Sequence, residues 1–478
     1  MIRRSHLLAT AAATSLMMIT AHADDSDIVT VESSSACYNG DSVVLDGGVV
    51  IRNTLGKMLT DHAAISNGDG ATLTLLELDD GVTIFLDDGA SLRCHNAVID
   101  FPKLLGTFSG AAADERVIFT DSADVAPVVI KSMTMEVALS KESTPPRYSV
   151  DDISAEDDVY FSYGDAITAF SDKALYRYFS AERYPDDFGS VIVLTPHEKG
   201  RSCRIVDNRG IAIDAKKVRI ETNTREVSCS HAAGAIDGDS DTITFSAGTV
   251  SWNIDGGSLA LHDDVIVDQK TFGHLTAVED LYLNKGADGI WSSATGNGTT
   301  TWSYTDDITG EMSMITCHGT TLIDNAKNIM LFSSDDSSHA TKRQVYHKNG
   351  MGEMFADTVA VHYIADESGD TAPKTMVVTG DVKIINDVVI DGKRMLKYAI
   401  ADRADYSLGS EAIVLKADEG KRVLFFDKNN NLQVSAEAVT IHLLENDNEE
   451  TISTVGDVRF ALNEEEYDMI KQQFNILR

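Results

Sequence analysis

The chain has 478 residues, 43% of them hydrophobic, and carries 40 Lys and Arg against 75 Asp and Glu, a formal net charge of -35 at pH 7. This hydrophobic content supports a sizeable core and excludes a wholly disordered chain. The acidity argues against nucleic-acid partners, because phosphates are held by clustered Lys and Arg. At about 100–200 residues per domain, the length predicts two or three domains.

The first 23 residues have the pattern of a secretory signal peptide. Arg3 and Arg4 form a basic region, Leu7 to Ile19 an apolar one, and Ala21-His22-Ala23 a cleavage site before Asp24. The apolar stretch is too short for a spanning helix, and an uncleaved anchor is the alternative interpretation. We therefore expect a mature chain that starts at Asp24 and resides in the periplasm.

Turn signals separate short runs rich in Val, Ile, Thr and Tyr along most of the chain. There are eight Asp-Gly and four Asn-Gly pairs, and these residues tolerate the positive φ of tight hairpin turns. Helical periodicity is nearly absent before residue 463. The sequence therefore predicts an all-β fold of many short strands.

A phase shift recurs within the apolar-polar alternation of these strands. The alternation skips two residues and resumes in the opposite phase, which on a straight strand would place the second half on the wrong face. A bulge or corner at the skipped pair restores the inward direction. We therefore expect strands that turn corners in a rolled, jelly-roll-like sheet at 92–99, 169–176, 213–220, 315–322, 354–361, 399–406 and 434–441.

These segments form two similar series along the chain. Val49 to Thr60 matches Val265 to Thr276, and Cys94-His95 matches Cys317-His318, with offsets of about 216 to 230 residues throughout. This pattern indicates a tandem duplication, unless the shared composition of β-strands produces it by chance. The predicted copies are 24–240 and 241–462. Residues 139–165 contain Pro145-Pro146 and an acidic run without alternation, and predict an exposed insertion in the first copy.

Residues 463–478 predict a terminal amphipathic helix. Asn463 and Glu466 have the spacing of a capping box. Apolar residues then recur at helical spacing: Tyr467, Ile470, Phe474 and Leu477. One interpretation is a plug over the open end of the last sheet. The other is a docking helix whose last three apolar residues contact a partner protein.

Motifs for catalysis and metal binding are missing from the sequence. It has no G-x-S-x-G elbow, H-E-x-x-H site, C-x-x-C pair or P-loop. The run Asp237 to Asp241 resembles the start of a calcium loop but lacks the later Gly and Glu. The five widely spaced cysteines predict buried free thiols, with a single Cys203–Cys229 bridge as the alternative. We expect a protein that is not an enzyme and uses no cofactor.

Residues 350–460 carry a resemblance to a known family. Strands of the form A-D-x-A-x-Y alternate there with strands of the form V-x-G-D-V-x-I, at 355–363, 377–384, 401–406, 412–415, 434–441 and 455–460. This alternation resembles the OstA-like repeat of periplasmic lipopolysaccharide-transport proteins, the LptA/LptC family. A weaker resemblance continues in order over 40–345.

The resemblance implies two tandem OstA-like β-jelly rolls, V-shaped and incompletely closed. It implies that lipid A acyl chains lie inside the roll and that copies assemble edge to edge between the inner and outer membranes, with other envelope transport components at each membrane. Burial of each CH₂ group contributes ~0.8 kcal/mol to such binding. The implied lipid-contacting residues are Val359, Val361, Val377, Val382, Ile384, Ala401, Tyr406 and Ile413.

Two other interpretations of the same pattern stay open. The inward residues also suit an ordinary closed core that holds no ligand. The chain also suits a secreted structural module that binds a protein partner in the envelope without lipid.

Overall fold

A computed structural model defines the fold of the chain. It describes residues 17–19, 29–38, 40, 42–67, 73–87, 89–122, 126–143, 146–179, 184, 188–197, 201–236, 242–256, 258–269, 273–286, 291–305, 310, 312–334, 344–350, 352–365, 371–390, 393–407, 412–442 and 451–474. The predicted signal peptide lies outside these residues except for Met17–Ile19, which form strand β1. The run Asp237 to Asp241, which lacks the later residues of a calcium loop, and Leu477 lie outside them too.

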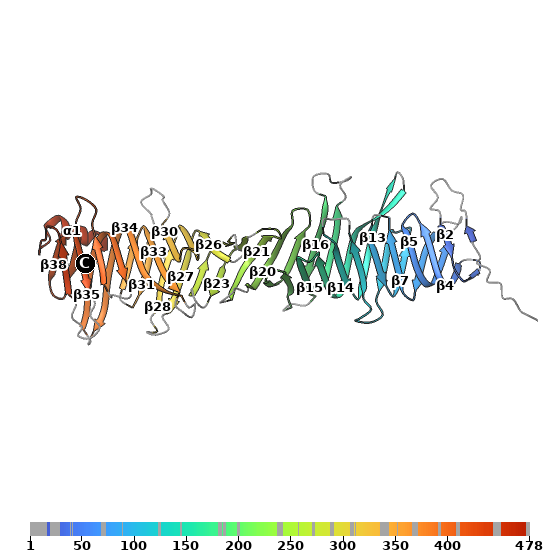
Figure 1. Cartoon of the computed structure of the whole chain (residues 1–478), viewed down its shortest axis with the longest axis horizontal. Helices are drawn as coiled ribbons and strands as arrows, with labels where there is room; N and C mark the ends of the chain where they lie inside the picture. Colours follow the sequence, from blue (N-terminus) through green and yellow to red (C-terminus); the bar gives the residue numbers. More distant parts are fainter. Residues whose placement is uncertain are drawn as a thin grey trace, which may run out of the picture. The chain divides into compact units, whose positions relative to one another are not determined.

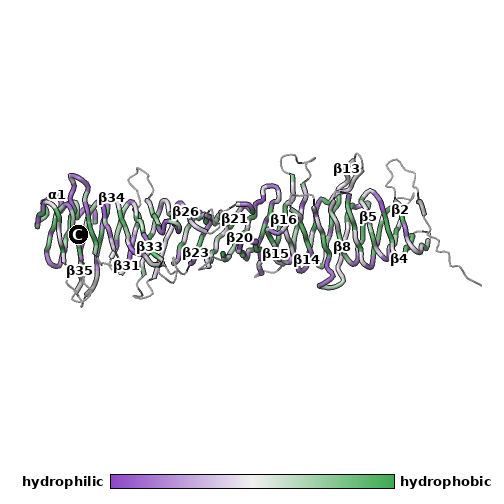
Figure 2. Tube along the Cα trace, viewed as in Figure 1, coloured by the Kyte–Doolittle hydropathy of each residue, from purple (hydrophilic) through white to green (hydrophobic). Residues whose placement is uncertain are grey.

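The fold is an all-β roll of antiparallel strands, which confirms the predicted class (Figure 1). The chain divides into two compact units, unit 1 (Met1–Cys229) and unit 2 (Ser230–Arg478). Strand β20 (Glu226–Ile236) contains this division, whereas the sequence repeats place the boundary at 240. Hydrophobic and hydrophilic residues alternate along the strands of each unit (Figure 2).

In unit 1 the strands pair in two antiparallel rows. The first row contains β6 (Leu73–Asp79), β9 (Asn96–Asp100), β10 (Leu105–Ser109), β13 (Thr134–Ser143), β16 (Gly189–Thr195) and β19 (Lys217–Glu221). The second row contains β7 (Val82–Leu86), β8 (Ser91–Cys94), β11 (Val117–Asp121), β12 (Val128–Ser132), β17 (Cys203–Asp207) and β18 (Ile211–Ala215).

Long bent strands run through both rows of unit 1. They are β4 (Ser42–Asn53), β5 (Gly56–Asn67), β14 (Pro146–Tyr163) and β15 (Ile167–Phe179). In β5, for example, one half pairs with β6 in the first row and the other with β7 in the second. At the N-terminal end, β2 (Val29–Glu32) and β3 (Ser35–Tyr38) each pair with β4, and β1 pairs with β2.

Unit 2 repeats this arrangement. Its first row contains β22 (Ser258–His262), β25 (Asp280–Lys285), β26 (Trp291–Asn297), β29 (Thr320–Asp324), β30 (Ile329–Ser333), β33 (Thr358–Ala365), β36 (Ala412–Lys416), β39 (Ala438–His442) and β40 (Thr451–Val455). Its second row contains β23 (Val265–Gln269), β24 (Gly273–Ala277), β27 (Thr300–Thr305), β28 (Met312–Cys317), β31 (Val345–Asn349), β32 (Gly352–Ala356), β37 (Val423–Asp427) and β38 (Leu432–Ala436). The long strands are β21 (Ile243–Asn253), β34 (Thr371–Ile390) and β35 (Lys393–Ser407).

The predicted corners are the places where the chain crosses from one row to the other. The segment 92–99 leaves β8 in the second row, turns at His95 and enters β9 in the first. Leu92 and Cys94 before the turn, and Ala97 and Ile99 after it, are all buried. The change of phase thus keeps both halves facing inward, as the sequence predicts.

The predicted insertion at 139–165 is wrong. The described residues 139–143 and 146–163 belong to β13 and β14, which pair with each other, and β14 also pairs with β12 and β15. The alternation is present but interrupted by register shifts after Ala138 and after Glu156. The first shift changes the phase of the buried residues, and the second introduces the exposed pair Asp157 and Asp158, so no uninterrupted period-two pattern runs through the segment. Its buried residues are Tyr148, Val150, Ile153, Ala155, Val159, Phe161 and Tyr163.

The cysteines are free thiols, so the alternative Cys203–Cys229 bridge is absent. Four of them are buried and Cys37 is exposed. Burial raises the pKa of the Cys94, Cys203 and Cys229 thiols to about 12. These groups therefore stay protonated at neutral pH and are poor nucleophiles.

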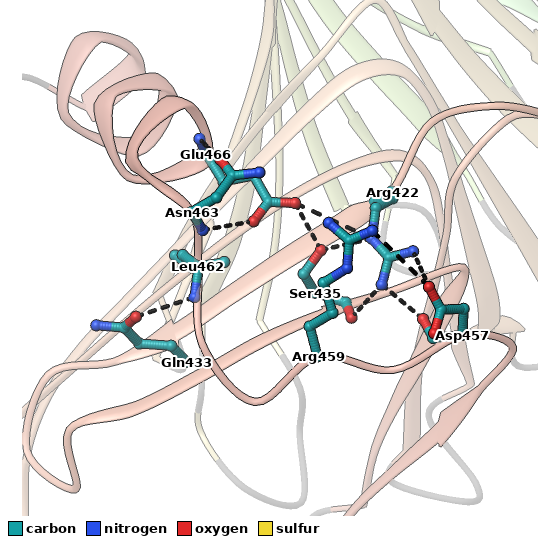
Figure 3. A network of polar contacts seen from close by, with 8 residues as sticks. All are labelled: Arg422, Gln433, Ser435, Asp457, Arg459, Leu462, Asn463 and Glu466. Atoms are coloured by element: carbon teal, nitrogen blue, oxygen red, sulfur yellow. Dashed lines mark hydrogen bonds and ion pairs between the residues drawn. The ribbon is translucent and has the colours of Figure 1, made fainter.

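Helix α1 (Glu464–Phe474) begins with the predicted capping box. The Glu466 amide donates to Asn463 Oδ1 at 2.8 Å, and the Asn463 amide donates to Glu466 Oε2 at 2.9 Å (Figure 3). Each residue thereby satisfies an amide that the first turn of a helix leaves without a partner. Glu466 also accepts a hydrogen bond of 2.8 Å from Ser435 Oγ in β38, which joins the helix start to the sheet.

The helix packs on the outer face of β35 and β37. Ile470 is 1% exposed in a cluster with Leu396, Tyr398, Leu424 and Phe426, and Phe474 packs against the same cluster. Ile470 therefore belongs to the protein's own core, which contradicts its assignment as a partner-docking residue. Phe474 packs against Tyr398 in a tilted arrangement, with ring centroids 5.2 Å apart, so it too faces the sheet.

The segment before α1 covers the free edge of β38. Ser435 and Arg459 exchange two backbone hydrogen bonds of 2.9 and 2.8 Å. The Arg422 guanidinium donates to the carbonyl oxygens of Ser435 and Asp457 at 2.7 and 2.6 Å (Figure 3). This edge of the second row is therefore occupied by the chain itself, whereas β40 at the end of the first row is paired on one side only, by β39, within the described part of the chain.

Candidate functional site: an apolar cavity in unit 2

A cavity of about 80 Å³ lies between the two rows of unit 2. One wall is a line of cross-strand partners in the second row: His347, Met354, Ile384, Ala399 and Phe425. The other wall is such a line in the first row: Met376, Tyr406, Ile413 and Ile441. The two lines face each other because every second side chain of a strand points to the same face.

The second-row wall ends in a polar rim. Asn386 and Lys397 are cross-strand partners located two residues beyond Ile384 and Ala399, and both line the cavity. Asn349 and Glu353 contribute polar groups from the β31–β32 hairpin. The cavity therefore passes from an apolar interior to a rim of mixed charge.

Three of the residues predicted from the family resemblance line this cavity, namely Ile384, Tyr406 and Ile413. Four others are buried nearby without lining it: Val359, Val361, Val382 and Ala401. The eighth, Val377, is only half-buried, and its neighbours Met376 and Val378 are the inward residues of β34. The assignment of Val377 as an inward residue is therefore wrong, because two adjacent valines leave the phase of a strand undetermined.

Several residues that line the cavity are not among those predicted from the sequence. Met354, Met376 and Phe425 line the cavity, yet the repeat motif names only its Val, Ile, Ala and Tyr positions. The alternation Met354-x-Ala356 and Met376-x-Val378 carries the signal that identifies the two methionines. Methionine adapts its shape to irregular gaps, which suits the lining of a cavity.

A second, smaller cavity of about 50 Å³ lies between the rows near the start of unit 2. Its apolar lining includes Val267, Leu275, Leu281, Leu283, Ala294 and Trp302. These residues come from β23, β24 and β27 of the second row and from β25 and β26 of the first row. Unit 2 thus leaves apolar space between its rows at two places.

His347 is a buried histidine in the wall of the main cavity. Its side chain is 6% exposed, and desolvation lowers its pKa from 6.5 to about 4. The folded protein therefore keeps the imidazole neutral under conditions in which the unfolded chain binds a proton.

This burial predicts a loss of stability in acid. Between pH 6.5 and about 4 the unfolded state binds one more proton than the folded state, so the free energy of unfolding falls as the pH falls. The contribution of the neutral His347 to the free energy of unfolding is fully present above pH 6.5. At about pH 5 this contribution is smaller by about 2 kcal/mol. Urea denaturation of the wild type and of His347→Leu across this range measures it. An identical pH dependence of the two proteins would contradict the prediction.

The described residues contain no group of three or more His, Cys, Asp and Glu side chains that could hold a metal ion. Nor does any helix in the described ranges have the length and hydropathy needed for a membrane crossing. His95 lies 3.9 Å from Asp80, and His318 contacts Thr299 at 3.1 Å. Neither histidine, therefore, is part of such a group.

A scan against protein-family models and a search of curated proteins each find no match to this chain.

Proposed function

We propose that the protein is a periplasmic carrier that binds the acyl chains of lipopolysaccharide between the rows of unit 2. The observation that carries this proposal is the apolar cavity with a polar rim, lined by Ile384, Tyr406 and Ile413. The OstA-like repeat pattern supports it, because these three residues belong to that pattern. This role requires no catalytic step.

The energetics favour an apolar chain as the occupant. Each CH₂ group removed from water contributes ~0.8 kcal/mol, so a few methylene groups give measurable affinity. The cavity volume of about 80 Å³ is several times the ~15 Å³ that one water-sized group needs. The rim residues Asn386 and Lys397 leave the polar part of the lipid in contact with water and with hydrogen-bonding groups.

Assembly through sheet edges is part of the same proposal, with other envelope components at the inner and outer membranes as partners. The β38 edge is covered by the chain's own segment at Arg459, so strand addition there is blocked. Strand β40 supports the proposal, because it is paired only with β39 in the described part of unit 2 and its residues are largely exposed. An exposed strand edge is a template for a further strand.

Native mass spectrometry with lipopolysaccharide and a de-acylated control tests lipid binding. We expect binding that requires the acyl chains. Ala404 is 1% exposed and lines the cavity, so Ala404→Phe should fill the space and weaken binding by about tenfold or more.

The matched control is Val377→Phe, which adds a ring of the same size on the outward face of the neighbouring strand β34. Circular dichroism and thermal unfolding confirm that both variants fold, since overpacking costs about 1–3 kcal/mol. Equal binding of the de-acylated control, or equal loss of binding in both variants, would overturn the proposal. The chain would then be a structural module with a closed core.

A further inference from the structure

A groove of about 730 Å³ runs over the outer face of the second row of unit 1. Its floor is a line of cross-strand partners from six strands, β7, β8, β11, β12, β14 and β15. The residues of this line are Thr83, Arg93, Ile118, Lys131, Tyr160 and Phe170. Their neighbours Phe119, Ile130 and Phe161 are fully buried, so the floor residues face away from the interior.

One wall of the groove is a rigid turn. Ala112 and Glu115 form an isolated bridge between β10 and β11, and the Arg116 guanidinium donates to the Ala113 carbonyl at 2.9 Å. Arg116 also donates to the carbonyl oxygen of Asp158 at 2.8 Å and forms an ion pair with its carboxylate. These contacts hold the turn beside the bulge in β14 that contains Asp158. The groove is therefore built by the fold and does not depend on loose side chains.

The floor presents two aromatic rings to solvent. Tyr160 and Phe170 are cross-strand partners in an edge-to-face pair, with ring centroids 5.5 Å apart. Phe170 is 47% exposed. The Lys131 ammonium lies 5.1 Å from the centre of the Tyr160 ring. A half-exposed aromatic ring lacks part of the stabilisation that burial from water would give. A ligand that covers the ring supplies this stabilisation, which then contributes to binding.

Two cations in the groove lack a carboxylate partner within the described part of the chain. Among the described residues, neither Arg93 nor Lys131 forms an ion pair, although Asp and Glu outnumber Lys and Arg by 75 to 40 in the chain. Arg204, the next cation along the same cross-strand line, is paired with Asp214 at 3.7 Å. The unpaired charges therefore coincide with the groove and its aromatic floor.

We propose that this groove binds an acidic saccharide, a sugar ring that carries a carboxylate or a phosphate. Arg93 and Lys131 bind the anionic group, and the apolar face of the sugar ring covers Phe170 and Tyr160. The carboxylates of Asp114 and Glu115 line the groove and accept hydrogen bonds from sugar hydroxyls.

This combination favours a saccharide over other anions. An acidic peptide supplies charge but no flat apolar face for the rings. Nucleic acid needs more basic residues than the groove contains, and the charge of -35 opposes it. The site lies in unit 1 on the outer face, so the inference does not depend on lipid binding in the cavity of unit 2.

Isothermal titration calorimetry of the whole mature chain tests the inference. Oligogalacturonate is the acidic probe, and its fully methyl-esterified form is the neutral control with the same rings. Glucose 6-phosphate and glucuronate distinguish a phosphate from a carboxylate as the bound group. Inorganic phosphate has no sugar ring, so its comparison with glucose 6-phosphate measures the contribution of the ring. We expect binding of the acid form that weakens with added salt.

Three substitutions assign the binding to the groove. Arg93→Gln or Lys131→Gln should weaken the binding of oligogalacturonate by about tenfold, because a neutral amide cannot replace the charge-assisted hydrogen bond to the carboxylate. Phe170→Ala should weaken the binding of oligogalacturonate and also any residual binding of its methyl-esterified form. Arg204→Gln is the matched control, because it removes a paired cation from the same face outside the groove, and should leave the affinity unchanged.

Other outcomes would overturn the inference. They are equal binding of the methyl ester, unchanged affinity in Arg93→Gln and Lys131→Gln, or an equal loss in Arg204→Gln. Binding of polyglutamate as tight as that of oligogalacturonate would identify an acidic-peptide surface instead. Thermal unfolding of each variant shows whether a loss reflects the site or the fold.

Discussion

Replacing Gly56 with alanine is expected to lower the free energy of unfolding of unit 1 by more than about 3 kcal/mol. Gly56 begins β5 with φ at 139°, a conformation that side chains rarely adopt. A Cβ at this position lies 2.0 Å from the carbonyl oxygen of Phe85 in β7. Because Gly56 is paired with Leu86 of β7, the two strands would have to separate to admit the methyl group.

Gly89→Ala is the matched control for this prediction. Gly89 also has a positive φ, 95°, but a Cβ there meets nothing within 4 Å. Its substitution should cost only the backbone strain, about 1 kcal/mol. Urea denaturation of both variants measures the difference. Equal destabilisation by the two substitutions would show that the close approach of β5 and β7 is not what requires glycine at position 56.

The same arrangement occurs in unit 2. Gly273 begins β24 with φ at 90°, and a Cβ there lies 2.4 Å from the carbonyl oxygen of Ser303 in β27. Gly56 and Gly273 fall within the two segments that match in sequence, Val49 to Thr60 and Val265 to Thr276. Gly352 at the start of β32 has the same requirement, with φ at 150° and a Cβ 2.2 Å from the carbonyl oxygen of Ile385. The close approach is therefore a recurring feature of hairpins in this roll and does not by itself identify a tandem duplication.

The sequence predicts the fold class and its corners because these depend on local patterns. A phase shift in the alternation has only one way to keep both halves of a strand inward, which is to bend the chain. The capping box of Asn463 and Glu466 is also local, and the structure confirms it. The strands at 139–165 escape prediction because two register shifts break their alternation into pieces too short to recognise.

The sites depend on pairing between distant strands, which the sequence does not reveal. The cavity in unit 2 combines residues from His347 to Ile441, and whether an inward valine lines space or fills a core depends on the distance between the rows. Val359 and Ile384 look alike in sequence, yet Val359 is 1% exposed and does not line the cavity, whereas Ile384 lines it. The groove in unit 1 likewise requires the register of six strands.

Removal of the Ile470 side chain is expected to release helix α1 from the sheet. Ile470→Ala takes apolar volume from the cluster formed by Tyr398, Leu424 and Phe426, and such core truncations cost about 2–5 kcal/mol. Met469→Ala is the matched control, because Met469 is the adjacent helix residue and is 46% exposed. Hydrogen exchange of the α1 amides measures the release, and equal protection in both variants would contradict it.

Release of the helix has a consequence for the edge of β38. Glu466 accepts a hydrogen bond from Ser435 in that strand, and Arg459 pairs with the same residue, so helix and edge cover are one continuous segment. When α1 detaches, this cover weakens and the edge gains access to another chain. Ile470→Ala should therefore associate in a concentration-dependent way, measured by light scattering after size-exclusion chromatography, while Met469→Ala keeps the behaviour of the wild type. Association of both variants alike would show that the cover on β38 does not depend on the helix.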